Sequence, residues 1–211
     1  MTIEETGSDV EKFSGALKES AGVYGVALNE HDRLRLSDYY SLVVKWNRRL
    51  HLVAPCAPAE FATRHVLESL LLLPHLPLRE RVVDVGSGAG LPIMPCLLVR
   101  PDLEAVLVEA SLKKAIFLRE AIDQLKLRAQ VVVDRFEKTN APQVKFLTCR
   151  ALERFQEMLP QLVAWPPIPS TFLLFGGHNL RARLEELNLP FVSTPIPKSE
   201  GRFLFVVNRE Q

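Results

Sequence analysis

The most informative stretch for the fold of this chain is Val83-Asp-Val-Gly-Ser-Gly-Ala-Gly-Leu91. A short β-branched run ends within it, and three glycines at alternating positions, Gly86, Gly88 and Gly90, lead into a predicted helix. Glycine permits positive φ angles and lets a ligand approach the backbone closely. Unpaired amides at a helix N-terminus attract a carboxylate or a phosphate. The stretch therefore predicts a site for a small anionic group at the carboxyl edge of a sheet.

Segments typical of strands and of helices alternate from this stretch to the C-terminus. Short apolar runs predict strands at residues 81–85, 105–109, 130–133, 144–148, 171–175, 191–196 and 202–207. Apolar residues at helical spacing predict helices at residues 111–125, 151–163 and 180–187. Strands that alternate with helices form a mainly parallel sheet covered on both faces. We therefore expect an α/β fold with a doubly wound, mainly parallel seven-stranded sheet, whose last two strands are antiparallel.

The first 78 residues show no such alternation and are predicted to be helical or flexible. A clear helix begins after Asn29, a good N-cap residue. One stripe of its side chains is expected to be buried: Leu36, Tyr39, Tyr40, Val43 and Trp46. A second helix is expected from Pro58 to about Leu73. We divide the chain into a flexible or weakly helical N-terminus with a short helix around residues 10–20 (1–28), a helical appendage (29–78) and a ligand-binding domain (79–211).

The spacing of the glycines and two nearby acids distinguish between two classes of cofactor, dinucleotides and S-adenosylmethionine. A dinucleotide site has the spacing G-x-G-x-x-G, whereas Asp84 followed by G-x-G-x-G favours S-adenosylmethionine. Asp84 is expected to meet the ammonium group of the methionine part, directly or through water. Glu109, at the end of the next strand, is expected to accept hydrogen bonds from both ribose hydroxyls. The alternatives are that the stretch is only a turn, that Asp84 only braces it, and that Glu109 is only a solvated strand end.

Composition limits the class of protein. Lys and Arg number 26 and Asp and Glu 25 in 211 residues, a formal net charge of +1, which argues against nucleic-acid binding by bulk charge but allows a local basic face. Three distant cysteines without a CxxC pair indicate no zinc site and a reducing compartment. No apolar run is long enough for a membrane span, and the acidic N-terminus lacks the order of a signal peptide. We expect a cytoplasmic protein.

Several segments together resemble the RsmG family, also called GidB. The glycine stretch extended to Pro92 resembles that family's glycine loop, and the order and spacing of the other segments hold from about residue 30 to residue 155. Those segments, several of which are uncommon in other methyltransferases, lie at residues 45–54, 64–70, 100–103, 113–120, 135–137 and 149–151.

The resemblance implies a class I methyltransferase with a Rossmann-like fold. Members of the family methylate N7 of a guanosine in bacterial small-subunit ribosomal RNA and use S-adenosylmethionine. The resemblance implies that Gly86 and Leu91 line the donor site and that Phe136 and Glu137 contact the adenosine end. It places Arg150 beside donor and substrate, as the residue that positions both, with no general base and no metal expected.

RNA contacts are expected from basic residues on one face. The resemblance places Arg64 and His65 on the face turned to RNA. The other candidates for backbone phosphates are Lys45, Arg48, Arg49, Lys113 and Lys114. For each basic residue taken singly, a solvated surface position is the alternative. The implied partner is small-subunit ribosomal RNA or an assembling ribosomal particle, with a monomeric protein and no membrane.

Three residues depart from the family pattern on the expected substrate side. Ile93 replaces a glycine and is expected to narrow the rim of the pocket, His51 replaces an asparagine, and Phe175 replaces a lysine. These departures leave other functions open. The alternatives are a methyltransferase of a small metabolite, a non-catalytic module that binds donor or RNA and, more distantly, a nicotinamide oxidoreductase.

Overall fold

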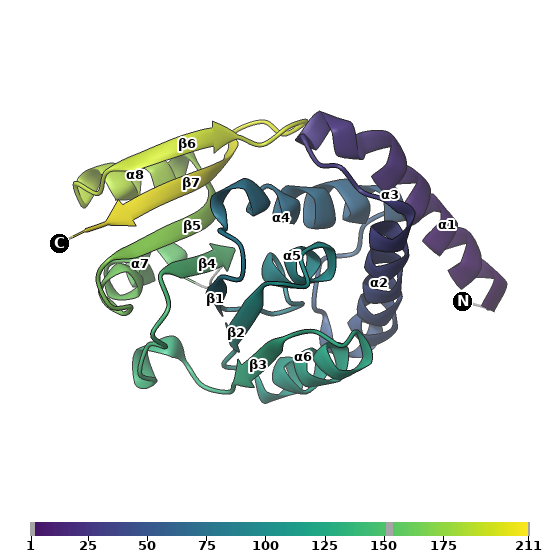
Figure 1. Ribbon diagram of the computed structural model, residues 1–211, viewed down its shortest axis with the longest axis horizontal. Helices are drawn as coiled ribbons and strands as arrows, with labels where there is room; N and C mark the ends of the chain where they lie inside the picture. The colour runs from purple at the N-terminus through teal and green to yellow at the C-terminus, as the bar shows by residue number, and fades with distance from the viewer. Residues whose placement is uncertain (1–2, 151–153, 211) are drawn as a thin grey trace.

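The computed structural model describes residues 3–150 and 154–210 and contains one sheet of seven strands (Figure 1). The strand order is β3-β2-β1-β4-β5-β7-β6. All predicted strands are present, with bounds within two residues of those predicted. They are β1 (Arg81–Val85), β2 (Glu104–Val108), β3 (Ala129–Val132), β4 (Phe146–Arg150), β5 (Ser170–Gly177), β6 (Phe191–Pro195) and β7 (Arg202–Arg209).

The pairing of the strands confirms the doubly wound topology. Strands β1 to β5 are parallel to their neighbours, and β7 runs antiparallel between β5 and β6. The chain winds outward from β1 to β3 on one side and from β4 to β5 on the other. The carboxyl ends of β1 and β4 therefore lie side by side at the switch point, where open α/β sheets bind their ligands.

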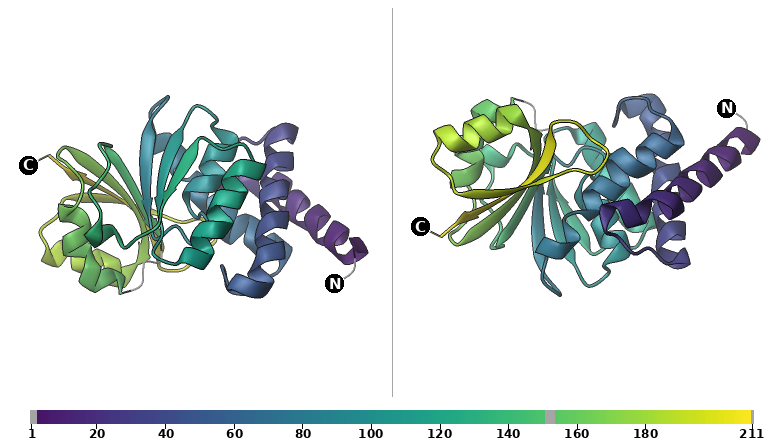
Figure 2. Two further views of the ribbon diagram at one scale, coloured as in Figure 1. Left: turned by 90° about the horizontal axis from the view of Figure 1, so that it is seen from below. Right: turned by 90° about the horizontal axis from the view of Figure 1, so that it is seen from above.

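Helices cover both faces of the sheet, as Figure 2 shows. Because side chains alternate along a strand, Ala105 and Leu107 of β2 join one hydrophobic cluster and Val106 and Val108 join the other. The first cluster is closed by α1 (Ile3–Ser20), α2 (Glu30–Leu50), α5 (Ile93–Val99) and α6 (Leu112–Gln124). The second is closed by α7 (Phe155–Ala164) and α8 (His178–Glu186). Residues 151–153 of the predicted helix 151–163 lie outside the described residues.

The N-terminal segment is more helical than the sequence predicts. Helix α1 is 18 residues long, and its Phe13 and Leu17 are fully buried. The Phe13 ring stacks on Tyr40 of α2 with 4.4 Å between the ring centroids. The predicted short helix around residues 10–20 is present as the C-terminal part of α1, but its extension to Ile3 was not predicted, because helices are stabilised mainly by packing, here on α2, and less by local propensity. The division of the chain at residues 28 and 78 stays a prediction.

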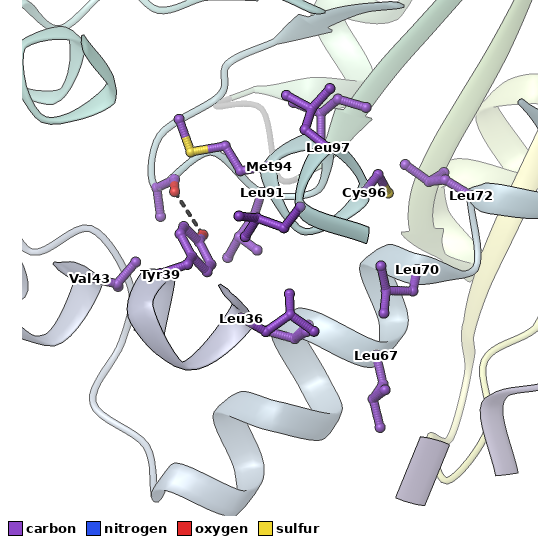
Figure 3. Close-up of a cluster of buried hydrophobic side chains, with 14 of the residues drawn as sticks. Leu36, Tyr39, Val43, Leu67, Leu70, Leu72, Leu91, Met94, Cys96 and Leu97 are labelled. Atoms are coloured by element: carbon purple, nitrogen blue, oxygen red, sulfur yellow. Dashed lines mark hydrogen bonds between the residues drawn. The ribbon is translucent and has the colours of Figure 1, made fainter. Parts of the chain in front are cut away.

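Helix α2 begins where the sequence predicts and packs its buried stripe against α5. The Asn29 side-chain oxygen accepts a hydrogen bond from the backbone amide of Asp32 at 2.9 Å. The Asp32 carboxylate accepts one from the backbone amide of Asn29 at 3.1 Å. Figure 3 shows Leu36 and Tyr39 of α2 facing Met94 across a core of buried side chains. This packing fixes α2 against the segment that follows the glycines.

The second predicted helix is interrupted by a wider turn. It consists of α3 (Pro58–Glu60), the π-helical segment η2 (Phe61–Leu67) and α4 (Glu68–Leu70). Arg64 and His65 lie in the π-helical segment, a geometry that is frequent at functional sites. None of the described helices combines the length and the apolar character that a membrane span requires.

Candidate functional site

The glycine stretch forms a tight loop between β1 and α5. Gly86, Gly88 and Gly90 have φ angles of 73°, 55° and 84°, in the left-handed region that glycine adopts without penalty. A Cβ atom at Gly90 would also overlap the side chain of Met94. The three positions therefore require glycine for backbone reasons, as the sequence predicts.

The amides of this loop are not unpaired, contrary to the prediction. Gly86 donates to the carbonyl of Val108 at 2.9 Å, and Gly90 donates to the carbonyl of Ser87. Gly88 donates to Glu109 Oε2 at 2.8 Å. The prediction assumed that the loop opens directly onto a helix N-terminus, whereas several turns separate β1 from α5 and use these donors.

Glu109 lies directly after β2 and joins the loop to the next helix. Its Oε2 accepts from the Gly88 amide and its Oε1 accepts from the Ser111 amide, both at 2.8 Å. Its side chain is buried, with 7% of the residue exposed. A carboxylate has about four acceptor positions, so each oxygen keeps capacity for a further donor. Glu109 thus braces the loop, and its expected role as the acceptor for two ribose hydroxyls stays a prediction.

Asp84 is the penultimate residue of β1, two positions before Gly86 of the loop. Its Oδ1 accepts from the Thr148 hydroxyl of β4 at 2.7 Å, and its Oδ2 is buried without a hydrogen-bond partner in the described part of the chain. Burial raises the pKa of Asp84 from 3.8 to about 7. Asp84 lines neither of the two cavities described below. Its expected contact with an ammonium group therefore stays a prediction.

Helix α2 holds the loop from the other side, a link that sequence reasoning missed. Tyr39 is fully buried, and its hydroxyl donates to the carbonyl of Ala89 at 2.8 Å, the dashed line in Figure 3. The sequence identified Tyr39 as one residue of an apolar stripe. No local signal shows that its hydroxyl reaches a loop 50 residues further along the chain.

A cavity of about 350 Å³ opens beside the loop at the ends of β2 and β3. Glu109, Phe136 and Glu137 line it, as expected for residues at one binding site. Phe136 is buried and packs edge-on against Trp165, with 5.7 Å between ring centroids. Asp134, which directly precedes the segment quoted for the resemblance, also lines this smaller cavity. Its place just after β3 is the signal that would have predicted it.

A larger cavity of about 590 Å³ lies on the other side of the loop. The two cavities share Gly86 and Lys114 in their walls, and Leu91 lines the larger one. Arg150, the last residue of β4, also lines it, with 14% of its side chain exposed. Its Nη1 is buried and has no hydrogen-bond partner within the described residues.

The rest of the Arg150 guanidinium is held by the π-helical segment. Nη2 donates to the carbonyl of Arg64 at 2.8 Å and lies 3.1 Å from His65 Nδ1. Glu68 Oε2 lies 3.7 Å from the same nitrogen. Arg202 of β7 contacts both oxygens of Glu68, at 2.8 and 2.9 Å.

Sequence reasoning missed Glu68 and Arg202. Glu68 has 2% of its side chain exposed, and its burial raises its pKa. An acid between the apolar Leu67 and Leu70 was the available signal, because a buried carboxylate requires a cationic partner. Arg202 lies 134 residues further along the chain.

The structure brings only some of the predicted RNA-facing residues to the larger cavity. Arg64, His65 and Lys114 line it. The remaining basic residues are exposed on α2 and α6, away from the cavity wall, and Lys45 there lies 3.9 Å from Glu120. These four are Lys45, Arg48, Arg49 and Lys113.

The three departures from the family pattern have different positions. Ile93 is fully buried in the hydrophobic core and lines neither cavity, so the expectation that it narrows the pocket rim is wrong. His51 ends α2 in a left-handed conformation, φ 48°, which asparagine adopts more readily than histidine. Phe175 of β5 does line the larger cavity, where the Arg150 guanidinium lies 5.9 Å from its ring centroid.

The polar groups that line the two cavities fit a nucleoside that carries an amino-acid tail. Glu109 offers two carboxylate oxygens to a vicinal diol, and the smaller cavity has room for a base beside it. The unpartnered Arg150 Nη1 requires an anionic or neutral acceptor, such as a carboxylate. Among the described residues no cluster of three or more His, Cys, Asp or Glu could hold a metal ion.

Comparisons with known proteins agree with this geometry. Ribosomal RNA small subunit methyltransferase G of Chromobacterium violaceum is 38% identical over 146 residues, which are 68% of this chain and 69% of the relative. The protein of the same name from Dichelobacter nodosus is 34% identical, over 77% of this chain and 78% of the relative.

Solved structures share the fold at low sequence identity. A methyltransferase from Aquifex aeolicus that depends on S-adenosylmethionine has a TM-score of 0.52 at 16% identity, over 66% of this chain and 87% of that one. A ribosomal protein L11 methylase from Lactobacillus delbrueckii has a TM-score of 0.55 at 12% identity, over 70% and 79%. These neighbours confirm the class I methyltransferase fold.

Two findings show the family of this chain: the length of the match to a family model and the sequence identity with the relatives. The family model described as rRNA small subunit methyltransferase G matches residues 33–197. The chain therefore belongs to the GidB family of rRNA small subunit methyltransferases G and is a methyltransferase that depends on S-adenosylmethionine.

Proposed function

We propose that the protein transfers the methyl group of S-adenosylmethionine to N7 of a guanosine in small-subunit ribosomal RNA. The observation that carries the proposal is the pair of cavities that share Gly86 and Lys114. One cavity contains the Glu109 carboxylate, which suits a ribose, and the other contains the unpartnered Arg150 guanidinium. Small-subunit ribosomal RNA appears in the names of the relatives, which supports RNA as the acceptor.

The smaller cavity and the loop form the proposed donor site. When bound, S-adenosylmethionine supplies an electrophilic methyl group on its sulfonium. We assign the ribose hydroxyls to Glu109, whose oxygens keep acceptor capacity beside two backbone amides. Phe136 and Glu137 are assigned to the adenosine end. Gly86 and Leu91 are assigned to the donor-site wall on the side of the larger cavity. Asp84, which lines neither cavity, is assigned to the ammonium group, directly or through water.

The larger cavity forms the proposed acceptor site, and its chemistry requires no general base. Guanine N7 carries a lone pair that is unprotonated near neutral pH, so no proton has to be removed before the methyl group is transferred. The remaining tasks are positioning and the exclusion of water. Arg150 is the proposed catalytic residue, because its Nη1 is a buried donor in the wall of this cavity.

The RNA backbone is proposed to lie along the exposed basic residues of α2 and α6. Side chains reach N7 poorly in the deep major groove of paired RNA, so the target should be in a loop, a bulge or a distorted helix. Arg64 and Lys114 are the proposed phosphate contacts nearest to the base, since both line the larger cavity. The proposed partner is small-subunit RNA, naked or in an assembling particle, bound by a cytoplasmic monomer.

A second candidate follows from Phe175. This side chain is 6% exposed and adds an aromatic wall to the larger cavity, where the family pattern has a lysine. An apolar wall suits a small aromatic metabolite as the methyl acceptor. The two candidates differ in how binding responds to salt, because phosphate contacts weaken steeply as salt increases.

Mass mapping of modified nucleotides tests the proposal. Unmodified small-subunit RNA and particles are incubated with the protein and S-adenosylmethionine, and each fragment is weighed. The expected result is one guanosine that gains one methyl group, with loss of product for Arg150→Lys and full product for the surface control Arg183→Lys, whose native arginine pairs with Glu186.

Two outcomes would refute the proposal. Methyl transfer that is confined to small molecules would favour the metabolite enzyme. Normal donor affinity without product on any RNA would indicate a non-catalytic module.

A further inference from the structure

One side chain of the acceptor cavity has a tautomer that its neighbour determines. Arg150 Nη2 lies 3.1 Å from His65 Nδ1. A guanidinium has only hydrogen-bond donors, so it cannot accept a hydrogen bond from the imidazole. His65 Nδ1 must therefore be the acceptor, and the ring proton must be on Nε2. The packing of the ring against Phe61, with 5.0 Å between centroids, restrains its plane.

The charges around His65 keep the ring neutral. Burial, reinforced by Arg150, Arg64 and Arg202, lowers the pKa of His65 from 6.5 to about 3. Glu68, the first residue of α4, is the nearby acid, and both of its oxygens contact Arg202. The neutral Nε2–H form therefore persists over the physiological pH range, in contrast to a solvated histidine.

The imidazole of His65 is part of the wall of the acceptor cavity. His65 lines the larger cavity, and its Nε2 has no hydrogen-bond partner among the described residues. Arg150 Nη1 is a second donor of the same wall without a partner. The wall thus presents N–H donors to its occupant.

We propose that His65 Nε2–H donates a hydrogen bond to O6 of the target guanine and so selects guanine over adenine; this inference rests on the proposed function. Guanine N7 and O6 are neighbouring acceptors on one edge, whereas adenine presents an amino group in place of O6. During the reaction the N7–methyl bond forms as the methyl–sulfur bond breaks, so the N7 lone pair is not available to the enzyme. O6 is the group on this edge that remains for recognition. His65 keeps its proton throughout and is neither acid nor base.

The test compares two RNAs that differ at one exocyclic group. Small-subunit RNA is prepared with guanosine, or with 2,6-diaminopurine riboside, at the mapped target position. The second base keeps N7 but replaces O6 with an amino group. The wild type should prefer guanosine in kcat/KM, and His65→Asn should reduce that preference by about fivefold, the lower end of the discrimination of a bidentate base contact, because a single hydrogen bond is removed. His65→Gln, whose amide nitrogen reaches the Nε2 position, should retain most of it.

A measurement on the wild type makes the test independent of any variant. Long-range proton–nitrogen NMR correlations of the imidazole should show the neutral Nε2–H tautomer, unchanged from about pH 5 to about pH 8. A proton on Nδ1, or titration in that range, would overturn the inference.

The kinetic outcomes separate this inference from the proposed function. An unchanged guanosine preference in a folded His65→Asn protein would refute the inference alone, even if RNA binding weakened. A wild type that methylates neither RNA would refute the proposed function and the inference with it.

Discussion

Replacement of Asp84 by Asn is predicted to change how the stability of the ligand-free protein depends on pH. Asp84 is fully buried, with one oxygen bound by Thr148, and its pKa is raised from 3.8 to about 7. The difference of about three pKa units corresponds to about 4 kcal/mol. Because the folded protein retains a proton that the unfolded chain has lost, the wild type should lose this stability as the pH rises from about 4 to about 7.

Urea unfolding of both proteins between about pH 4 and about pH 8 measures the effect. Asparagine does not titrate, so the free energy of unfolding of Asp84→Asn relative to wild type should increase by about 4 kcal/mol and level off above about pH 7. If the asparagine amide itself destabilises the fold, the difference in free energy of unfolding is offset by a constant, but its change with pH stays the same. A difference that is flat over this range would show that Asp84 is already ionised in the free protein and would refute the reasoning.

Three further substitutions test the loop and the RNA face. Gly90→Ala should lower the free energy of unfolding by at least about 1–2 kcal/mol, because its φ of 84° is left-handed and the added Cβ would also overlap Met94. Thermal unfolding should show no such loss for Gly22→Ala, which has open space around it. Tyr39→Phe should cost about 1 kcal/mol in urea unfolding, since it removes a buried hydrogen bond to the loop, and unchanged stability would contradict that role. Arg49→Ala should reduce the slope of log affinity for RNA against log salt concentration by about 0.7–0.9, because one phosphate contact is lost. Lys126→Ala, beyond the C-terminal end of α6, is the control. An equal reduction of the slope by this control would refute an RNA-binding face confined to the exposed basic residues of α2 and α6.

The sheet could be predicted because its signals are local. The parallel strands β1, β2, β4 and β5 are largely buried on both faces and are therefore short apolar runs. The three glycines after β1 mark a loop whose positive φ angles favour glycine. Asn29 could be recognised as the N-cap of α2 for the same reason, since capping depends on residues three apart. Local chemistry thus predicted the elements and the edge of the sheet where the site lies.

The parts of the site that could not be predicted are mostly contacts between residues that are distant in sequence. The ion pair between Glu68 and Arg202 joins an N-terminal helix to the last strand, and a periodicity of a few residues contains no information about it. The burial of Ile93 was also missed, because a family pattern shows that a residue differs but not which way its side chain points. The state of the loop amides depends on Glu109, whose carboxylate reaches back across 21 residues to Gly88.

The glycine loop and Glu109 are proposed to bind S-adenosylmethionine together. Calorimetric titration with this cofactor measures that binding, using Glu109→Ala and the control Glu104→Ala, which changes the opposite and more exposed end of β2. We predict one cofactor per wild-type chain, an affinity loss of at least about tenfold for Glu109→Ala, since two hydrogen bonds to a charged group are removed, and no loss for Glu104→Ala. Equal affinities of Glu109→Ala and wild type, or no binding by the wild type, would contradict the claim.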